Sequence, residues 1–124
     1  MSFTFSQPLD QSFLESLYED DLSYAQEVFT GFLSDTKAEF EQIKGLYTQN
    51  DLKKIRQGLH KIKPTFAFVG LPVLTEKVEV LIKACDAATD VKDIEPYCSE
   101  IFKEAEEAFV LIGNELARMK THTG

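Results

Sequence analysis

The segment LHKIKPTFAFVG, residues 59–70, holds the residues of this sequence that are best suited to chemistry. Five basic residues lie near its histidine, His60, on both sides along the chain: Lys53, Lys54, Arg56, Lys61 and Lys63. Residues 53–63 contain no acidic residue. Neutral imidazole is a nucleophile near physiological pH, so His60 could accept a group from another molecule. Because the whole chain carries a formal net charge of -8, this local positive charge indicates an anionic group, and a phosphoryl group fits best.

Lys63 and Arg56 are the expected charge partners of such a group. On a helix Lys63 lies one turn after His60 and Arg56 one turn before it, so their cations could offset the charge of a phosphoryl group. An alternative stays open, because an exposed histidine between lysines can equally belong to an ordinary solvated helix face. Spacing and charge alone do not separate these two interpretations.

A predicted helix over residues 52–69 positions the histidine. Its apolar residues recur at helical spacing: Leu52, Ile55, Leu59, Ile62, Phe66 and Val69. On a helical wheel His60 lies roughly 130° from the centre of this stripe. Four other residues share its outward sector: Lys53, Arg56, Lys63 and Ala67. We therefore expect His60 to be exposed to solvent and ringed by positive charge.

Apolar residues at spacings of three and four predict further helices over residues 9–18, 22–47, 71–85 and 94–120. Asn50 is the predicted N-cap of the His60 helix, Gly70 ends it, and Pro72 lies in the first turn of the next helix. No stretch alternates as a strand would. We predict an all-α fold, an antiparallel up-down-up-down four-helix bundle with a short additional N-terminal helix.

Composition narrows the class of protein. At 124 residues the chain is expected to form one domain over residues 1–124, and we expect a monomer. Its acidic balance argues against binding to nucleic acid or to an anionic membrane surface. No apolar run approaches the roughly 20 residues of a membrane span, and the N-terminus lacks the features of a signal peptide. We therefore expect a cytoplasmic protein with reduced cysteines, Cys85 and Cys98, in packing positions.

The order of residues after His60 resembles the signature of histidine-containing phosphotransfer (HPt) domains, H-x-L-K-G-x-x-x-x-x-G. In HKIKPTFAFVG, His60 matches the phosphorylated histidine and Lys63 matches the lysine. Ile62 stands for the usual leucine, and Gly70 matches the second glycine. A short first helix followed by four long ones, with the signature in the second of these, resembles that family over nearly the whole chain.

The resemblance implies a phosphorelay intermediate of two-component signalling. Its partners would be receiver domains of response regulators or hybrid sensor kinases. His60 would accept a phosphoryl group from the aspartate of one receiver, and another receiver would remove it. The receiver would bring the Mg²⁺, so no cofactor or metal is expected on this chain. The sequence has no Walker-type phosphate loop, and we expect a carrier without an ATP site rather than an enzyme.

Pro64 departs from the signature, which has glycine at this position. Proline removes the N–H that would bond to the carbonyl of His60 and crowds that carbonyl, at a cost of about 3 kcal/mol in a helix interior. In one interpretation the helix absorbs the change, because the freed carbonyl faces water, and His60 works normally. In the other, a kink re-aims the imidazole and alters the rate of transfer or the choice of receiver.

Several residues near His60 are candidates for contact with a receiver or its phosphoryl group: Lys53, Arg56, Gln57, Lys61, Pro64, Ala67 and Phe68. Ala67 is small and could leave an open floor beside the imidazole, and Gln57 could bond to a phosphoryl oxygen or face water. Phe68 could dock a partner, but we expect it to pack under the N-terminal helix.

Two other functions are compatible with an all-α bundle of this kind. The first is an HPt-like interaction module that binds a receiver or kinase without carrying phosphate, in which Pro64 marks lost transfer. The second is a metal- or thiol-dependent enzyme, and the sequence argues against it. There is no Glu-x-x-His pair for a bundle metal site, and the only other histidine is His122.

Overall fold

The computed structural model of the protein describes residues 3–123, most of which are helical. The α-helices are α1 Gln11–Tyr18, α2 Leu22–Gly31, α3 Lys37–Thr48, α4 Leu52–Phe68, α5 Pro72–Ala87 and α6 Glu95–Thr123. A π-helix, η1 Phe32–Thr36, joins α2 to α3, and a short 3-10 helix, η2 Val91–Ile94, precedes α6. The described residues contain no β-strand, and the predicted all-α class is confirmed.

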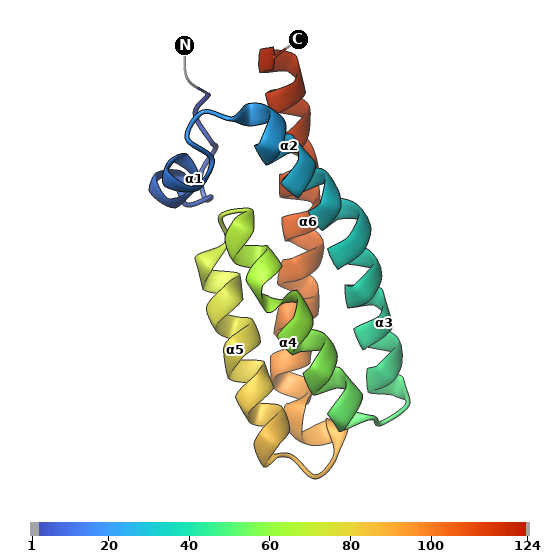
Figure 1. The fold of residues 1–124 in the computed structure, drawn as a ribbon. Helices are drawn as coiled ribbons and strands as arrows, with labels where there is room; N and C mark the ends of the chain where they lie inside the picture. The colour runs from blue at the N-terminus through green and yellow to red at the C-terminus, as the bar shows by residue number, and fades with distance from the viewer. Residues whose placement is uncertain (1–2, 124) are drawn as a thin grey trace.

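The helices are arranged as a bundle (Figure 1). The elements α2, η1 and α3 follow one another along a single rod, and α4, α5 and α6 run beside it, each returning along the element before. Helix α4 packs against α3 and α5, while α6 packs against α2 and α5. The short helix α1 lies at the end of the bundle where α2 begins and α4 finishes. Helix α4 therefore has a neighbour on each side and an outer face between them.

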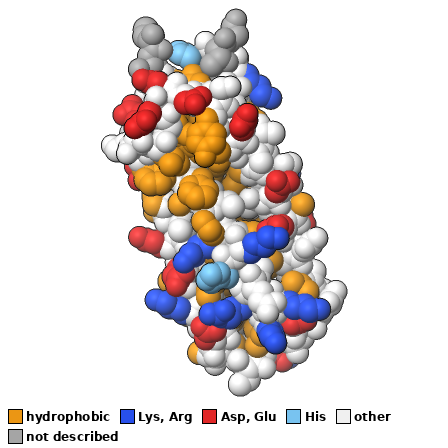
Figure 2. All heavy atoms as spheres, in the orientation of Figure 1, with side chains coloured by type: hydrophobic (Ala, Val, Ile, Leu, Met, Phe, Trp, Pro, Cys, Tyr) orange, Lys and Arg blue, Asp and Glu red, His pale blue; other side chains and the backbone are white. Residues whose placement is uncertain are grey.

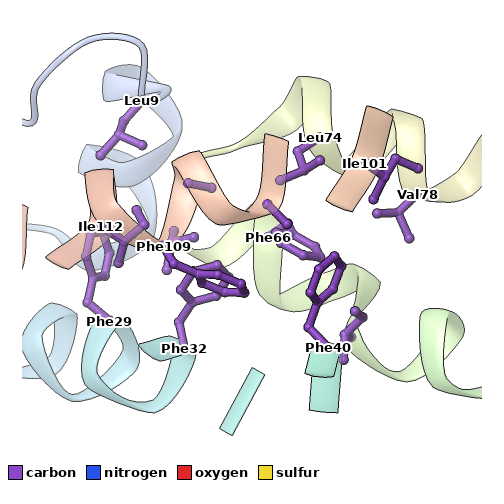
Figure 3. Packing of buried hydrophobic residues seen from close by; sticks show 14 of the residues in the cluster. Leu9, Phe29, Phe32, Phe40, Phe66, Leu74, Val78, Ile101, Phe109 and Ile112 are labelled. Atoms are coloured by element: carbon purple, nitrogen blue, oxygen red, sulfur yellow. The ribbon is translucent and has the colours of Figure 1, made fainter. Parts of the chain in front are cut away.

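Aromatic rings fill the core that holds α4 in place. Figure 3 shows Phe32 and Phe40 from the α2–α3 rod meeting Phe66 of α4 and Phe109 of α6. The ring centroid of Phe32 lies 5.5 Å from that of Phe66 and 5.3 Å from that of Phe109, in the range of favourable aromatic pairs. Because Phe66 is fully buried, the rotation of α4 about its axis is fixed by this packing.

The π-helix η1 is a feature that the sequence prediction missed. Apolar spacing predicts one continuous α-helix over residues 22–47, whereas the structure has a wider turn at Phe32–Thr36. A π turn holds more residues than an α turn, so it shifts the phase of the residues on either side. Phe29, Phe32 and Phe40 all face the core as a result, and Thr36 is buried with them. Spacings of three and four do not distinguish this arrangement from a regular helix.

Aspartate side chains cap three of the α-helices, α1, α2 and α4, and the 3-10 helix η2 at their N-termini. Asp51 accepts a hydrogen bond from the N–H of Lys54 at 3.1 Å and is the N-cap of α4. The prediction that Asn50 has this role is wrong. Asn50 adopts a left-handed conformation with φ 58° instead, and its side-chain oxygen accepts from the N–H of Val91 at 3.1 Å. Asn50 thus ties the α3–α4 turn to the start of η2. The other predicted boundaries agree within a few residues.

Gly70 ends α4 and α5 begins at Pro72, as the sequence predicts. Gly70 has a φ of 81°, and its N–H and that of Leu71 bond back to the carbonyls of Ala67 and Phe66 at 2.9 and 3.0 Å. A β-carbon at Gly70 would lie 2.7 Å from Leu14 Cδ1 of α1. A glycine is therefore required both by the backbone conformation and by the close approach of α1.

The N-terminal segment of residues 3–9, here called the strap, is bonded to α6. Its buried apolar residues are Phe3, Phe5 and Leu9. The N–H of Ser6 donates to Glu115 Oε2 at 2.6 Å, and Arg118 donates to Glu115 Oε1 at 2.6 Å. Arg118 also donates to the Ser6 hydroxyl and the Thr4 carbonyl. Glu115 is only 1% exposed, so a buried carboxylate joins the strap to the last helix.

Both cysteines are buried, as their packing phases predict. Burial raises the pKa of Cys98 to about 12 and also raises the pKa of Cys85. A thiol with a raised pKa is a poor nucleophile, so these residues serve packing. None of the helices described here is both long and apolar enough to cross a membrane.

Candidate functional site

His60 lies on the outer face of α4 and is exposed to solvent, as the helical wheel predicts. The residues on the opposite side of the same helix are fully or almost fully buried: Ile55, Leu59, Ile62 and Phe66. Figure 2 shows this face, with a histidine bordered by Lys and Arg side chains and a run of hydrophobic side chains beyond it. The apolar core thus presents the imidazole outward, where a second molecule can reach it.

Two ion pairs join α4 to α5 on one side of His60. Arg56 Nε lies 2.5 Å from Asp86 Oδ1, and Lys63 Nζ lies 2.6 Å from Glu79 Oε2. The two cations are seven residues apart on α4, and the two carboxylates are seven residues apart on α5. Matched spacing of this kind is what adjacent helices running in opposite directions produce. His60 lies between the two pairs along α4.

Further ion pairs lie on the α3 side of His60. Lys61 Nζ lies 2.7 Å from Glu39 Oε1 of α3, and Lys54 Nζ lies 3.9 Å from Asp51 Oδ2 at the start of α4. Lys53 is exposed and forms no ion pair with any residue that the structure describes. The expected ring of positive charge needs correction, because four of its five cations already contact a carboxylate. The acidic partners come from other helices or from the cap, and a reading of residues 53–63 alone cannot find them.

Glu79 is an acidic residue of α5 on which the charge of His60 acts. A hydrogen bond from Lys63 lowers the pKa of the Glu79 carboxyl, and the charges of Lys63, Lys83 and His60 lower it further. His60 acts on Glu79 when its ring is protonated. The sequence prediction did not include Glu79, although antiparallel helices place its position opposite Lys63. The site therefore contains a carboxylate as well as an imidazole and cations.

Pro64 lies inside α4 and is exposed, and the helix continues past it to Phe68. The hydroxyl of the next residue, Thr65, donates to the carbonyl of Ile62 at 2.6 Å, as serine and threonine hydroxyls do inside helices. This agrees with the interpretation in which the helix absorbs the proline, because α4 accommodates Pro64 on its outer face. The effect of Pro64 on transfer stays a prediction.

Phe68 corrects one expectation, because it is 45% exposed and does not pack under α1. Its backbone is tied to that helix, because the Tyr18 hydroxyl donates to the Phe68 carbonyl at 2.6 Å. Other large apolar side chains near this end of the bundle are also exposed: Phe13, Leu17 and Tyr24. An apolar surface thus adjoins the C-terminal end of the helix that carries His60.

Ala67 and Gln57 lie on different sides of α4. Ala67 lines a hollow of about 260 Å³ together with Phe13 of α1 and residues at the start of α5. Gln57 is exposed and lines a hollow of about 230 Å³ with Lys61 and Glu39, between α3 and α4. The predicted contact residues are therefore divided between an α5 side with an open apolar hollow and a polar α3 side. Among the described residues, no cluster of His, Cys, Asp and Glu could hold a metal ion.

Comparison with known proteins agrees with this geometry. A family model for the Hpt domain matches residues 27–121, which include α3, α4, α5 and nearly all of α6. The comparisons with curated proteins and with solved structures gave no match. The match covers well over half of the chain and includes the exposed histidine with its lysine one turn along α4. The chain therefore belongs to the Hpt domain family, the histidine phosphotransfer carriers of two-component signalling that interact with receiver domains of response regulators.

Proposed function

We propose that His60 is the phosphoacceptor of this Hpt domain. It would accept a phosphoryl group from the aspartate of one receiver domain and pass it to another. The observation that carries the proposal is the exposed imidazole on the outer face of α4, within the matched region. Lys63 lies one turn along, and an exposed apolar surface around Phe68 adjoins the same helix. These are a nucleophile, a cation for the transferred group and a surface for a partner.

The proposed transfer is an in-line displacement at phosphorus. The Nε2 lone pair of His60 forms the new P–N bond, and the P–O bond to the receiver aspartate breaks, with its electron pair leaving on the carboxylate. Transfer of this kind depends mostly on positioning and on stabilisation of charge. We propose that the receiver supplies the Mg²⁺ and that this chain supplies the imidazole and the ammonium of Lys63 without a cofactor.

Docking of the receiver would use residues on both sides of His60. We propose that Phe68 and Ala67 give apolar contact and that Pro64 shapes the surface next to the imidazole. The polar contacts would come from Lys53, Arg56, Gln57 and Lys61. Phe68 is the strongest candidate for an anchor, because exposed aromatic side chains dominate many interfaces.

The test is transfer from charged receivers. A panel of receiver domains carrying phosphoryl aspartate is mixed with the protein, and phosphate that is acid-labile and base-stable is measured on it. Wild-type protein should be labelled by at least one receiver, and His60→Gln should not. His122→Gln is the matched control, because it removes the other histidine of the chain and should leave labelling intact. Label that persists in His60→Gln would contradict the assignment of His60.

The same assay decides between the two interpretations of Pro64. Pro64→Gly restores the residue of the family signature at a position that is exposed in this structure. Equal labelling of the wild type and Pro64→Gly by the same receivers is expected if the helix simply absorbs the proline. A change in rate, or in which receivers react, would show that Pro64 controls the choice of partner.

A second function is an Hpt-like module that binds a receiver or kinase without carrying phosphate. The observation in its favour is that Lys63 and Arg56 already contact carboxylates, in addition to the presence of Pro64. Binding to a receiver that persists unchanged in His60→Ala, with no label on the wild type from any receiver, would support this function over transfer.

A further inference from the structure

Lys63 is the cation that a phosphoryl group on His60 would need, and it is already paired with Glu79. The two atoms are 2.6 Å apart, but the side chains of Lys63 and Glu79 are 32% and 39% exposed. An ion pair with this degree of exposure contributes little to stability, because water solvates both groups when the pair opens. Lys63 can therefore leave Glu79 for a stronger anion without a large cost to the fold.

A phosphoryl group on His60 is such an anion. It carries close to two negative charges and three acceptor oxygens, while Glu79 carries one charge. The ammonium of Lys63 has three donors on a flexible stem, so it can turn from one anion to the other or contact both. Before phosphorylation, the positive charge of a protonated His60 acts favourably on Glu79. After phosphorylation, the sign of this interaction is reversed, and Glu79 repels the modified ring.

We propose that Glu79 is a positioning residue that holds Lys63 before transfer and raises the free energy of phosphorylated His60. Glu79 competes with the phosphoryl group for Lys63 and adds a negative charge near it. This inference rests on the proposed function of His60 and concerns how long the phosphoryl group stays there. The expected consequence is a phosphohistidine that is lost or passed on more readily than it would be without the carboxylate.

Lys83 offers Glu79 a second partner when Lys63 turns away. It lies one turn after Glu79 on α5, in the favourable order of an acidic residue followed four positions later by a lysine. Its charge already acts on the Glu79 carboxyl. After the exchange Glu79 is paired with Lys83 within α5 instead of with Lys63 of α4. The ammonium of Lys63 is then free to bind the phosphoryl group.

The experiment uses phosphoramidate, so that it needs no receiver. His60 Nε2 attacks the phosphorus, the P–N bond of phosphoramidate breaks, and ammonia leaves with the electron pair and a proton. The donor is then removed, and the decay of acid-labile phosphate is followed at neutral pH. In that decay water attacks phosphorus, the bond to Nε2 breaks with its electron pair returning to the ring, and inorganic phosphate is released.

Glu79→Gln should slow this decay by about two- to fivefold, the range that exposed charge pairs produce. Glu100→Gln is the matched control. It removes the same charge and also breaks one of the two ion pairs that Lys77 of α5 makes with α6, while the pair with Glu104 remains. Its decay rate should equal that of the wild type. In a Lys63→Met background, Glu79→Gln should have less than half of its effect, because contacting residues are not additive.

Two results would overturn the inference. One is a Glu79→Gln decay rate equal to that of the wild type, and the other is a full Glu79→Gln effect in the Lys63→Met background. The latter would mean that the carboxylate acts by repulsion alone and does not compete for Lys63. Absence of label on the wild type, or label that remains in His60→Gln, would instead contradict the proposed function itself.

Discussion

Two carboxylate–cation contacts in this protein have the same length and opposite surroundings. Glu115 and Arg118 at the strap end of α6 are 2.6 Å apart, as are Glu79 and Lys63 beside His60. The Glu115 side chain is 2% exposed, whereas that of Glu79 is 39% exposed. The two pairs therefore do not differ in distance but in the burial of the carboxylate, since the Arg118 side chain is itself 48% exposed. The first pair is part of the fold, and the second can open when a stronger anion arrives.

The comparison extends to the regions around the two pairs. At the strap end, buried aromatic side chains and a buried carboxylate join residues that are more than a hundred positions apart in the chain. On the α4 face, exposed or partly exposed cations from one helix contact exposed or partly exposed carboxylates from its neighbours. Charges in the first region are fixed by their surroundings, while charges in the second can change partners. This difference is what a carrier of a transient anion needs.

The largest effect on stability is expected from Gly70→Ala, because Gly70 lies where the end of α4 meets α1, between the two regions. The left-handed φ of 81° costs about 1–2 kcal/mol for a residue with a β-carbon. That β-carbon would also lie 2.7 Å from Leu14 Cδ1 and 3.2 Å from the backbone nitrogen of Asp10. We expect a total loss of about 2–4 kcal/mol in the free energy of unfolding, measured by urea denaturation.

Gly113→Ala is the control for Gly70→Ala. A β-carbon at Gly113, in the middle of α6, would meet nothing within 4 Å. Alanine is the better helix former by about 1 kcal/mol, so this variant should be more stable than the wild type. Equal stability of Gly70→Ala and the wild type would contradict the close packing of α1 against the end of α4.

The next effect is expected from Glu115→Ala, which tests the buried pair directly. The substitution leaves the N–H of Ser6 and one donor of Arg118 without their acceptor in a partly buried place. We expect a loss of about 1–3 kcal/mol in the free energy of unfolding, again from urea denaturation. Glu115→Gln keeps an oxygen acceptor and should lose less. The exposed counterpart, Glu79→Ala, should destabilise the protein much less than Glu115→Ala, and the reverse order would refute the comparison.

The sequence predicts the α4 face well and the strap end poorly, for a physical reason. The outward position of His60 follows from helical periodicity, which buried residues such as Leu59 and Phe66 enforce along the whole of α4. Likewise, the end of α4 follows from Gly70, because few other residues adopt its backbone conformation. These features depend on residues that are close in sequence.

Apart from the π-helix η1 and the cap at Asp51, which are local, the features that the sequence prediction missed depend on contacts between distant residues. The partners of Lys63 and Lys61 come from α5 and α3, and the register of helix packing decides which acids lie opposite. The burial of Glu115 depends on a strap at the other end of the chain. The exposure of Phe68 depends on where α1 lies, which apolar spacing does not fix. Periodicity determines which face of a helix is buried, but not what a neighbouring helix presents to it.

A smaller effect is expected from Phe68→Ala, and it should appear in binding. Phe68 is 45% exposed, and its contact with Tyr18 uses the backbone, so stability should change little. Affinity for a receiver should fall by about five- to tenfold, as for an aromatic anchor near the edge of an interface. Titration calorimetry with a receiver that labels His60 measures this. Val110→Ala, at an exposed apolar position on α6, is the control and should bind normally.

The smallest effect is expected in the pH dependence of the exposed pair. A hydrogen bond from Lys63 and nearby positive charges hold the pKa of Glu79 below its usual value of 4.5. Because the pKa of Glu79 is lower in the folded state, the pair stabilises the fold fully at pH values above the pKa of the unfolded chain. This contribution is lost as the pH falls through the pKa of the folded state. The difference in thermal midpoint between the wild type and Glu79→Gln should therefore be small near neutral pH and vanish in acid.

Lys63→Met separates this pair from the other charges on the α4 face. It removes the largest cause of the lowered pKa, so Glu79→Gln in this background should give a nearly flat difference across the same pH range. A difference that increases as the pH falls would require a raised pKa for Glu79, and so a neutral carboxyl beside His60. A neutral carboxyl has no charge with which to hold or compete for Lys63, so the proposed exchange of Lys63 between two anions would then be contradicted.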